Sequence, residues 1–318
     1  MMKRRIAILG LTLVCAFAMT ACNGGKTGTS GTEKSSEEVI DDSVPYEDVV
    51  TGLAYIDDGD VNHTLDVFGT QTSTEAMPTI IEVHGGAYFG GEKELNAEHA
   101  KFFARRGFNV VTPEYTKLPG NGGFDATVRD LFAAYQWVYD NAEEYHFDLN
   151  NISITGDSAG GYYVLLTKAI WESEELQQYF GVTVPDFDLK AVVLTAPGTD
   201  ILALTEQVGK EGVSSFVADS IGADILLNEE LMSHLDLYTI IDPKVYEGVY
   251  MITSDQDNVT GAEVKKLHEY LTENGVDHVY KYYEGEGLIH TFNINKIDLE
   301  ESKLANQEMV DYIKEQMK

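Results

Sequence analysis

The sequence predicts an α/β protein whose central sheet is mostly parallel and is flanked by helices. From Val49 onward, short apolar segments rich in β-branched residues alternate with longer segments of helical periodicity, which is the pattern of strand–helix–strand units. Two of the short segments, Thr79–Val83 and Ala191–Leu194, are almost continuously apolar, as expected for strands that helices cover on both faces. Hydrophobic residues make up 43% of the 318 residues, so the chain can bury a large core and is not a disordered acidic chain.

The first 21 residues predict a signal peptide that is not part of the fold. Three basic residues, Lys3–Arg5, precede an apolar run from Ile6 to Ala18, which is too short to span a bilayer and has the arrangement of a secretory signal. The following segment, Met19–Cys22, resembles a bacterial lipobox. This resemblance implies that Cys22 is lipidated and anchors the protein to the outer face of a bacterial membrane. An ordinary signal peptide cleaved nearby is the alternative.

Residues 22–45 predict a flexible tether between this anchor and the folded part of the chain. They are rich in Gly, Ser, Thr, Glu and Lys and contain almost no large apolar side chain, so they cannot contribute to a packed core. One folded domain is therefore expected over residues 46–318. Both cysteines of the sequence, Cys15 and Cys22, precede it, so we expect neither a disulfide nor a cysteine-based zinc site in this domain.

Eight strands and five longer helices are expected in the folded domain. The predicted strands are Val49–Ile56, Thr64–Phe68, Thr79–His84, Asn109–Pro113, Ile152–Thr155, Ala191–Thr195, Val249–Thr253 and His278–Tyr283. The predicted helices are Ala97–Arg106, Ala126–Ala142, Ala159–Glu174, Ala262–Asn274 and Glu300–Lys318. The stretch from about residue 199 to residue 244 interrupts the alternation and is too long for a simple connection. We expect a small lid or binding insertion there.

A serine lies in a glycine-rich turn between the predicted strand Ile152–Thr155 and the helix that follows it. The segment Gly156–Gly160 has the pattern G-x-S-x-G, and a strand before it with a helix after it is the context in which this pattern forms a nucleophile elbow. The two glycines leave room for a tight turn that exposes the hydroxyl of Ser158, and the N–H of Ala159 lies at the helix N-terminus. Ser158 is therefore the candidate nucleophile, with a plain glycine-rich turn as the alternative.

A second glycine-rich loop, with the sequence His-Gly-Gly-Ala-Tyr, begins at the end of the predicted strand that closes with His84. Backbone N–H groups in a loop of this kind can point at a developing oxyanion. Gly86 and Ala87 are the expected donors, with Ala159 as the third, although the sequence alone does not decide between Gly85 and Ala87. His84 is expected to brace the loop rather than to take part in catalysis.

An aspartate and a histidine follow later strands of the same predicted sheet. Asp255 and Asp257 come after the strand Val249–Thr253, and His290 comes after the last strand. Because the C-terminal ends of parallel strands meet at one edge of a sheet, these side chains are expected beside Ser158. The chain order Ser, Asp, His is that of a hydrolase triad, in which the histidine is the base and the aspartate orients it.

Together these segments resemble the hormone-sensitive-lipase-like branch of the α/β-hydrolase esterases. That family has an HGGG-type loop, a GDSAGG elbow, an aspartate just before Pro-Leu and a histidine before an aromatic residue. Here Ala87 replaces the third glycine and Asn258 replaces the proline, while Pro113–Tyr115 is a further match. The resemblance extends over roughly residues 79–292. It implies the α/β-hydrolase fold and favours Asp257 over Asp255 as the acid.

The resemblance also implies a serine carboxylic-ester hydrolase that acts on short-acyl esters, with an acetylated or feruloylated carbohydrate as a candidate natural substrate. Ser158 would attack the ester carbonyl, with His290 as the base and Asp257 as the residue that orients it. The oxyanion would be held by the N–H groups of Gly86, Ala87 and Ala159. Neither a cofactor nor a metal ion is expected. Two alternatives stay open: a serine peptidase of the same fold, and a non-catalytic binding module on a hydrolase fold.

The charge of the chain excludes some classes of partner. The sequence contains 53 acidic and 22 basic residues, which gives a formal net charge of −31. This argues against nucleic-acid binding, because phosphate groups require a basic surface. It also disfavours adsorption to an anionic membrane, so membrane residence is expected to depend on the lipid anchor alone. A small-molecule ester is the expected partner, and the sequence predicts no oligomeric state.

Other polar residues of the domain are expected on the surface. The acidic segment Asp57–Asn62 lacks the glycine and the glutamate of a calcium-binding loop, so a solvated turn is expected there. The remaining histidines lie in predicted loops or at polar helix positions, where we expect them to be exposed: His63, His99, His146, His234, His268 and His278.

Overall fold

The computed structural model describes residues 40, 42, 45–70, 74–120 and 122–318. The predicted signal peptide, the lipidation site Cys22 and nearly all of the tether lie outside these residues, so they stay predictions. Within the described part of the chain, no helix is both long enough and apolar enough to cross a bilayer.

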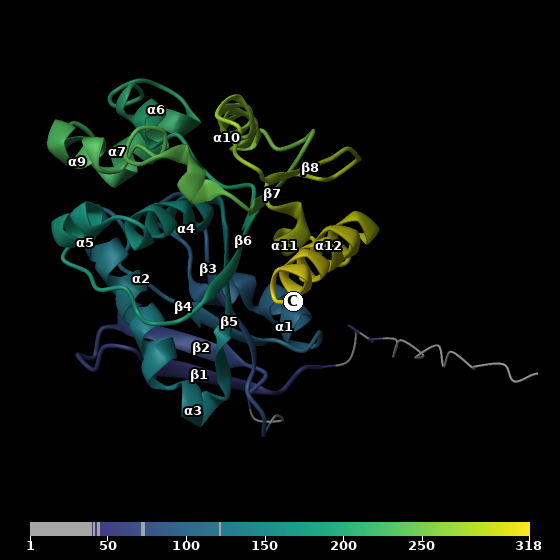
Figure 1. Cartoon of the computed structure of the whole chain (residues 1–318). Helices are drawn as coiled ribbons and strands as arrows, with labels where there is room; N and C mark the ends of the chain where they lie inside the picture. The colour runs from purple at the N-terminus through teal and green to yellow at the C-terminus, as the bar shows by residue number, and fades with distance from the viewer. Residues whose placement is uncertain (1–39, 41, 43–44, 71–73, 121) are drawn as a thin grey trace, which may run out of the picture. The chain divides into compact units, whose positions relative to one another are not determined.

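An eight-stranded sheet forms the centre of the folded unit, which comprises residues 40–318 (Figure 1). The strands are β1 (Val49–Ala54), β2 (Thr64–Phe68), β3 (Met77–Val83), β4 (Asn109–Pro113), β5 (Phe147–Asp157), β6 (Leu189–Thr195), β7 (Val249–Ser254) and β8 (Val279–Tyr283). They lie in the order β1-β2-β4-β3-β5-β6-β7-β8. β2 is antiparallel to both of its neighbours, whereas every other neighbouring pair is parallel.

Helices occupy most of the connections between these strands. The α-helices are α1 (Ala97–Ala104), α2 (Gly123–Asp140), α3 (Ala142–Tyr145), α4 (Ser158–Trp171), α5 (Glu174–Phe180), α6 (Ile201–Thr205), α7 (Val213–Ile221), α8 (Ala223–Leu226), α9 (Glu229–Ser233), α10 (Gly261–Glu273), α11 (Phe292–Asn295) and α12 (Glu300–Gln316). Short 3-10 helices are η1 (Val61–His63), η2 (Lys93–Asn96) and η3 (Pro243–Tyr246). Every predicted strand and helix is present, and the predicted fold, a mostly parallel sheet flanked by helices, is confirmed.

The side chains of the parallel strands divide between two cores, one on each face of the sheet. On one face, Ile81 and Val83 of β3 belong to the same apolar cluster as residues of α2, α4 and α10. On the other face, Ile80 of the same strand packs with residues of α1 and α12. Figure 1 shows α2, α4 and α5 on one side of the sheet and α1, α11 and α12 on the other. The nearly continuous apolar sequence of β3 thus reflects burial on both faces.

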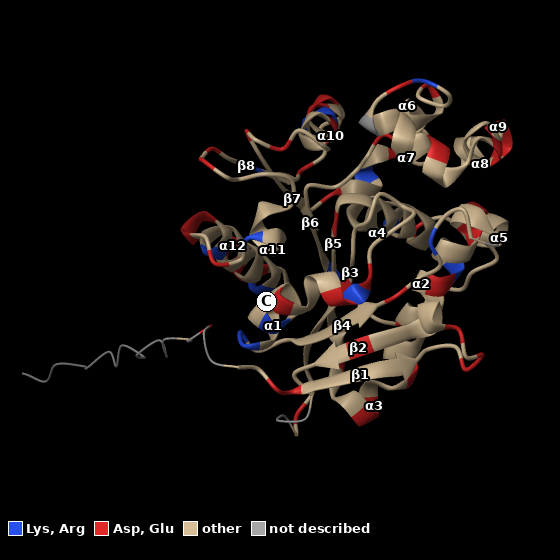
Figure 2. Cartoon of the chain, turned by 180° about the vertical axis from the view of Figure 1, so that it is seen from behind, with Lys and Arg blue, Asp and Glu red and all other residues tan. Residues whose placement is uncertain are grey.

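The segment between β6 and β7 forms the insertion that interrupts the alternation. Its helices α6–α9 are grouped at the end of the fold opposite β1 (Figures 1 and 2). The insertion is fixed at its start because the N–H groups of Thr199 and Asp200 donate to Oε2 of Glu263 at 2.7 and 2.9 Å. In α7, the ring of Phe216 meets Phe89 of the loop after β3 edge to face, with centroids 5.8 Å apart. The insertion therefore contacts that loop, while its role as a lid stays a prediction.

The expectation of a surface position is wrong for His99, whereas His63 is partly buried. His99 in α1 is 1% exposed, and its Nδ1 atom lies 2.6 Å from Oε1 of Glu82 in β3. The side chain of His63 is only 14% exposed and lies between Asp58 and Asp130. In both cases a carboxylate on another segment faces the imidazole, and these hydrogen bonds offset the cost of removing the polar groups from water.

Candidate active site

Ser158 lies in the turn between β5 and α4, at the C-terminal edge of the sheet. Its backbone has a left-handed φ of +51°, which is uncommon for a residue other than glycine and is typical of strained functional turns. Gly160 makes the turn possible, because a Cβ atom there would lie 2.2 Å from the carbonyl oxygen of Val83 and 2.4 Å from that of His84. The start of α4 therefore packs directly against the end of β3, and the turn has the geometry of a nucleophile elbow.

Three side chains from different strand ends meet at this edge in a continuous line of hydrogen bonds. The Nε2 atom of His290, in the loop after β8, lies 2.9 Å from Oγ of Ser158. The Nδ1 atom of the same ring lies 3.0 Å from Oδ1 of Asp257, in the loop after β7. In this arrangement the histidine can take the proton of the serine while the aspartate holds the opposite side of the ring.

Asp257 is buried and is held by several hydrogen-bond donors. Its Oδ1 atom accepts from the N–H groups of Val259 and Thr260 at 3.0 and 3.1 Å, in addition to its contact with His290. Burial raises the pKa of this carboxyl, but the hydrogen bond and charge of His290 and the two backbone donors outweigh that effect, so the pKa of Asp257 is lowered. The side chain is therefore an anion at neutral pH and can stabilise a protonated histidine.

Asp255, the other candidate acid, is exposed, and its Oδ1 atom accepts a hydrogen bond from the N–H of Gly285 at 3.3 Å. The structure thus places Asp257, and not Asp255, against His290. Within the described ranges, no group of three His, Cys, Asp or Glu side chains is arranged to hold a metal ion.

The loop after β3 has an unusual backbone that leaves two N–H groups open. Gly86, Ala87 and Tyr88 have φ values of +142°, +54° and +73°. The N–H of Gly85 donates to Oδ1 of Asp157 at 2.9 Å, whereas the N–H groups of Gly86 and Ala87, both half-buried, have no acceptor among the described residues. This favours Ala87 over Gly85 as an oxyanion donor.

The third expected donor is Ala159, the second residue of α4. Residues at this position of a helix have no carbonyl group one turn earlier to accept their N–H. The helix N-terminus also carries a partial positive charge that favours an anion. The N–H of Ala159 is therefore available beside the Oγ atom of the preceding residue, Ser158.

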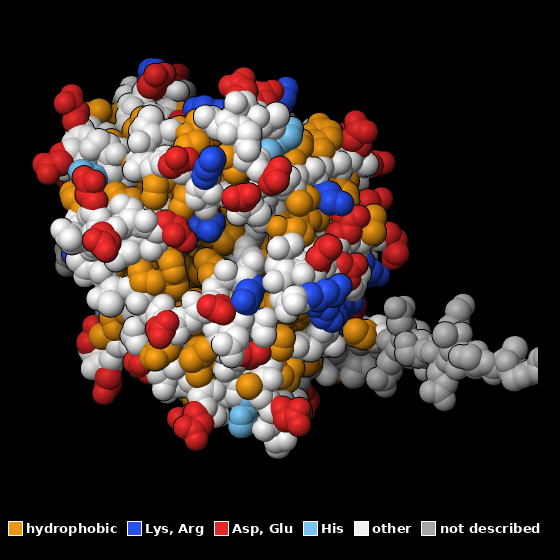
Figure 3. Space-filling view, in the orientation of Figure 1, with side chains coloured by type: hydrophobic (Ala, Val, Ile, Leu, Met, Phe, Trp, Pro, Cys, Tyr) orange, Lys and Arg blue, Asp and Glu red, His pale blue; other side chains and the backbone are white. Residues whose placement is uncertain are grey.

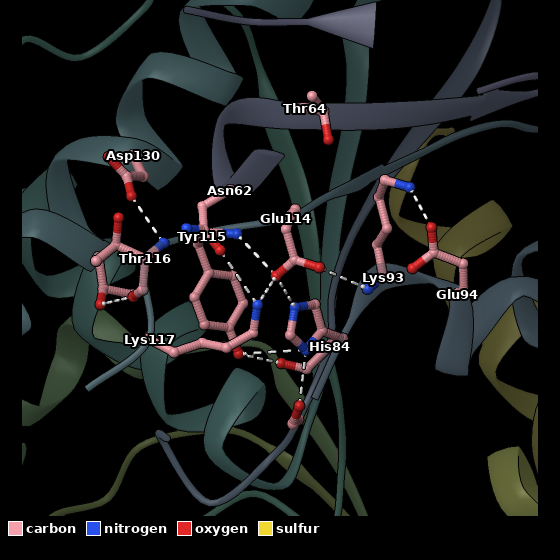
Figure 4. A network of polar contacts seen from close by, with 12 residues as sticks. Asn62, Thr64, His84, Lys93, Glu94, Glu114, Tyr115, Thr116, Lys117 and Asp130 are labelled. Carbon is pink, nitrogen blue, oxygen red and sulfur yellow. Dashed lines mark hydrogen bonds and ion pairs between the residues drawn. The ribbon is translucent and has the colours of Figure 1, made fainter. Parts of the chain in front are cut away.

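Buried polar residues hold this loop from behind (Figure 4). Nε2 of His84 lies 2.9 Å from Oε1 of Glu114, and its Nδ1 lies 2.7 Å from the carbonyl oxygen of Gly85. The ring of Tyr115 stacks on the imidazole with centroids 4.4 Å apart, and Nζ of Lys117 lies 2.6 Å from the same oxygen of Glu114. Burial would raise the pKa of Glu114, but the hydrogen bonds and charges of His84 and Lys117 lower it to about 2. His84 is thus fixed by an ionised partner and stacked on a tyrosine.

Sequence reasoning missed residues that hold the predicted ones in place. Thr260 is one: its Oγ1 atom lies 3.1 Å from Oδ2 of Asp257, 2.8 Å from the carbonyl oxygen of Ala196 and 3.4 Å from Nδ1 of His290. Asp157 is another, because it joins the elbow to the loop after β3. Asp157 stands inside the G-x-S-x-G pattern, and Thr260 stands three residues after Asp257. Their closeness in sequence to predicted site residues is the signal that could have identified them.

Comparisons of the sequence and of the structure identify similar proteins. The sequence model of the family described as BD-FAE matches residues 65–271. The crystal structure of esterase B from Lactobacillus Rhamnosis is similar, with a TM-score of 0.76, 28% identity, and coverage of 85% of this chain and 87% of that one. A structure of the same esterase inhibited with a C4-C4 tributyrin phosphonate has a TM-score of 0.75 and 27% identity, and the match covers 86% of this chain and 87% of that one.

Curated relatives match over a shorter segment. Fumonisin B1 esterase from Sphingopyxis macrogoltabida is 29% identical over an alignment of 119 positions, and the match covers 32% of this chain and 22% of the relative. Para-nitrobenzyl esterase from Bacillus subtilis is 29% identical over an alignment of 131 positions, and the match covers 34% of this chain and 27% of the relative. The matched segment thus spans only about a quarter of the length of these relatives, each of which is named as an esterase.

Proposed function

Since the chain belongs to the BD-FAE family of α/β-hydrolase esterases, we propose that it hydrolyses short-acyl carboxylic esters with Ser158 as the nucleophile. The observation that carries the proposal is the line of hydrogen bonds from Asp257 through His290 to Ser158, with distances of 3.0 and 2.9 Å. A serine hydroxyl is a weak nucleophile until an adjacent base takes its proton. The line supplies that base and a carboxylate that orients it.

The reaction has two halves. First, Oγ of Ser158 attacks the ester carbonyl carbon while Nε2 of His290 takes the hydroxyl proton; the tetrahedral intermediate then loses the alcohol, whose oxygen receives that proton. Second, His290 takes a proton from water, and the oxygen of that water attacks the acyl carbon. The bond from the acyl carbon to Oγ of Ser158 then breaks, His290 returns the proton to Oγ, and the acid is released. In both halves the oxyanion accepts hydrogen bonds from the N–H groups of Gly86, Ala87 and Ala159.

Two observations support a preference for short acyl groups. Esterase B, which is similar over most of this chain, has been crystallised with a C4-C4 tributyrin phosphonate. The His-Gly-Gly loop and the Gly-Asp-Ser-Ala-Gly-Gly elbow also resemble those of the hormone-sensitive-lipase-like branch, and this resemblance implies short-acyl esters as substrates. A series of p-nitrophenyl esters from acetate to laurate tests this preference: kcat/KM is expected to be highest for acetate or butyrate, and a maximum at laurate contradicts it.

For the natural substrate we propose a neutral acylated carbohydrate, with acetyl and feruloyl esters as candidates. Figure 3 shows acidic side chains spread over the visible face, and the net charge is −31. This field disfavours anionic substrates and anionic lipid surfaces, whereas a sugar ester carries no charge. Acetylated or feruloylated oligosaccharides are expected to give a higher kcat/KM than methyl esters of the same acids, and equal values would contradict the carbohydrate part of the proposal.

We also propose that the enzyme is exported and is held at the outer face of a bacterial membrane by a lipid on Cys22. The support is the lipobox-like segment Met19–Cys22 and the polar stretch that follows it. A Cys22→Ala variant is expected to leave the membrane fraction. Retention of this variant in the membrane would contradict the proposal.

Labelling with a fluorophosphonate probe tests the mechanism. The wild-type protein is expected to react and Ser158→Ala is not. Hydrolysis of p-nitrophenyl acetate without hydrolysis of aminoacyl-nitroanilides separates an esterase from a serine peptidase of the same fold, and the reverse profile favours the peptidase. A folded wild-type protein that neither reacts with the probe nor hydrolyses either substrate would instead be a binding module.

A further inference from the structure

A buried chain of polar side chains runs beneath the triad, and no step of the proposed reaction uses it. At its centre are Glu82 of β3 and His99 of α1, which are each 1% exposed and whose Oε1 and Nδ1 atoms are 2.6 Å apart. Glu82 stands in a strand that is otherwise free of charged residues. Removing two ionisable groups from water is costly, and Oε2 of Glu82 has no hydrogen-bond partner among the described residues. The residues that the pair does contact therefore indicate its role.

On one side the chain of contacts reaches the residue before the nucleophile. Nδ2 of Asn96 donates to Oε1 of Glu82 at 3.0 Å and to Oδ1 of Asp157 at 2.9 Å. The same oxygen of Asp157 accepts the N–H of Gly85 at 2.9 Å. Asp157 therefore fastens the elbow of Ser158 to the loop that carries the open N–H groups, and Asn96 fixes the carboxyl of Asp157 from below.

On the other side the chain of contacts reaches the turn that carries His290. Nε2 of His99 lies 3.2 Å from Oδ1 of Asn306 in α12. Asn306 exchanges two hydrogen bonds of 2.8 Å with Asn293 of α11, one through each Nδ2 group. Nδ2 of Asn293 also donates to Oγ1 of Thr195 at 3.0 Å. Asn293 and Asn306 are fully buried, and Asn293 stands three residues after His290.

The orientation of Asn306 determines which of its atoms faces the imidazole of His99. Its Nδ2 group faces the carbonyl oxygen of Asn293, which only accepts, so its Oδ1 atom faces Nε2 of His99. Nε2 must then carry a proton. The opposite ring nitrogen faces a carboxyl oxygen of Glu82, so a second proton lies between those two atoms. An unbroken line of hydrogen bonds thus connects Asp157 with Asn293.

We propose that Glu82 and His99 form the positioning centre of the active site. This pair aligns Ser158 and the oxyanion loop, which is the loop after β3 that contains Gly86 and Ala87, with His290. The inference rests on the proposed esterase function. The pair touches no reacting atom, so it acts through alignment, and alignment affects turnover more than substrate binding. A displacement of about 1 Å between reacting groups can cost on the order of 10²-fold in rate.

Two substitutions at His99 separate its contacts. His99→Asn keeps a donor near Glu82 and gives up the contact with Asn306, while His99→Gln reaches toward Asn306 and gives up Glu82. Each is expected to lower kcat for p-nitrophenyl acetate by about 10- to 100-fold, with KM changed by less than about 2-fold. Asn109→Ala is the matched control, because the fully buried Asn109 donates to the carbonyl oxygens of Tyr145 and His146 at the far end of β4. It is expected to lower the melting temperature but not kcat.

A double-mutant cycle measures whether the two ends are connected. Asn96→Ala and Asn293→Ala break the line on opposite sides of the central pair. If one network aligns both ends, the double variant is expected to lose little more kcat than the worse single variant, whereas multiplied losses would overturn the proposal. If the His99 variants do not fold, Asn96→Ala and Asn293→Ala test the proposal in their place.

The outcomes also separate this proposal from the proposed function. A wild-type protein without esterase activity or fluorophosphonate labelling contradicts the function, and the downfield proton resonance of the Nδ1–H of His290 then tests positioning. A shift or loss of that resonance in His99→Gln, but not in Asn109→Ala, supports the proposal. With an active wild type, unchanged kcat in both His99 variants, or the same loss of kcat in Asn109→Ala, overturns it.

Discussion

Replacing Glu114 with glutamine tests how the oxyanion loop is held. Glu114 is 6% exposed, and its Oε1 atom lies 2.9 Å from Nε2 of His84 and 2.6 Å from Nζ of Lys117. The amide oxygen of Glu114→Gln can keep both contacts, but the negative charge is lost. Its NH₂ group would also face the N–H of Lys93, which donates to Oε2 at 3.1 Å in the wild type.

The size of the effect follows from the pKa of Glu114. Burial works against ionisation, but His84 and Lys117 outweigh it and lower the pKa from 4.5 to about 2. Because the pKa is lower in the folded than in the unfolded state, the ionised carboxyl stabilises the fold above pH 4.5, and this contribution is lost as the pH falls toward 2. The gap corresponds to about 3 kcal/mol. Since glutamine keeps part of the hydrogen bonding, we expect Glu114→Gln to lower the free energy of unfolding at neutral pH by about 1–3 kcal/mol.

Urea denaturation of the wild type and the variant from neutral pH down to about pH 3 measures this contribution. The difference between their free energies of unfolding is expected to narrow below pH 4.5, where the wild-type carboxyl begins to lose its advantage. Glu300→Gln is the control: that side chain is 89% exposed and pairs with Lys303, so its effect is expected to stay below about 1 kcal/mol. A difference for Glu114→Gln that is the same at all pH values would refute the electrostatic reasoning.

Three further predictions concern other parts of the site. Asp257→Asn is expected to lower kcat by about 10³- to 10⁴-fold and Asp255→Asn by less than about 2-fold; p-nitrophenyl acetate kinetics decide, and equal losses would contradict the assignment. Gly160→Ala is expected to lose at least about 3 kcal/mol of stability, because the new methyl group meets backbone carbonyls that cannot move aside; a wild-type melting temperature would contradict this. Burial raises the pKa of Glu263, so the fold disfavours its ionised form at neutral pH, and this cost disappears as the carboxyl is protonated at lower pH. Glu263→Gln, which keeps an acceptor for two N–H groups, is therefore expected to unfold at the same or higher urea concentration at pH 7, with the difference vanishing near pH 4.

The sheet and the reacting residues could be predicted from the sequence because each has a local signal. The parallel strands are short apolar segments, because both of their faces are buried, and such segments are recognisable in the sequence. Ser158 is marked by its glycines. Asp257 and His290 could be placed beside it because both follow parallel strands, whose ends meet at one edge. For the acid, the choice between Asp255 and Asp257 depended on a resemblance until the contact with His290 was seen.

The supporting residues could not be predicted because their roles depend on contacts between distant segments. His99 stands on a short helix next to Glu98 and close to Lys101. Its burial becomes visible only when α1 covers β3 and brings Glu82 to 2.6 Å from it. Asn306 is separated from His99 by 207 residues. The insertion is similar: its length was evident, whereas its contact between Phe216 and Phe89 depends on how α7 folds back toward the loop after β3.

Backbone strain explains why the site needs so much support. Among the described residues, the non-glycine residues with a left-handed φ are Ala87, Tyr88, His146, Ser158, Ala196 and Thr291. All but His146 belong to the strand-end loops of the active site, where Thr291 directly follows His290 and the carbonyl of Ala196 accepts from Thr260. Such conformations cost about 1–3 kcal/mol each and persist only where the surroundings hold them. The reacting residues thus lie in or beside strained turns, which would adopt other backbone conformations without the contacts that hold them. The buried contacts of Asp157, Glu114 and Thr260 are where the fold resists that relaxation, so conservative substitutions there are expected to reduce turnover before they unfold the protein.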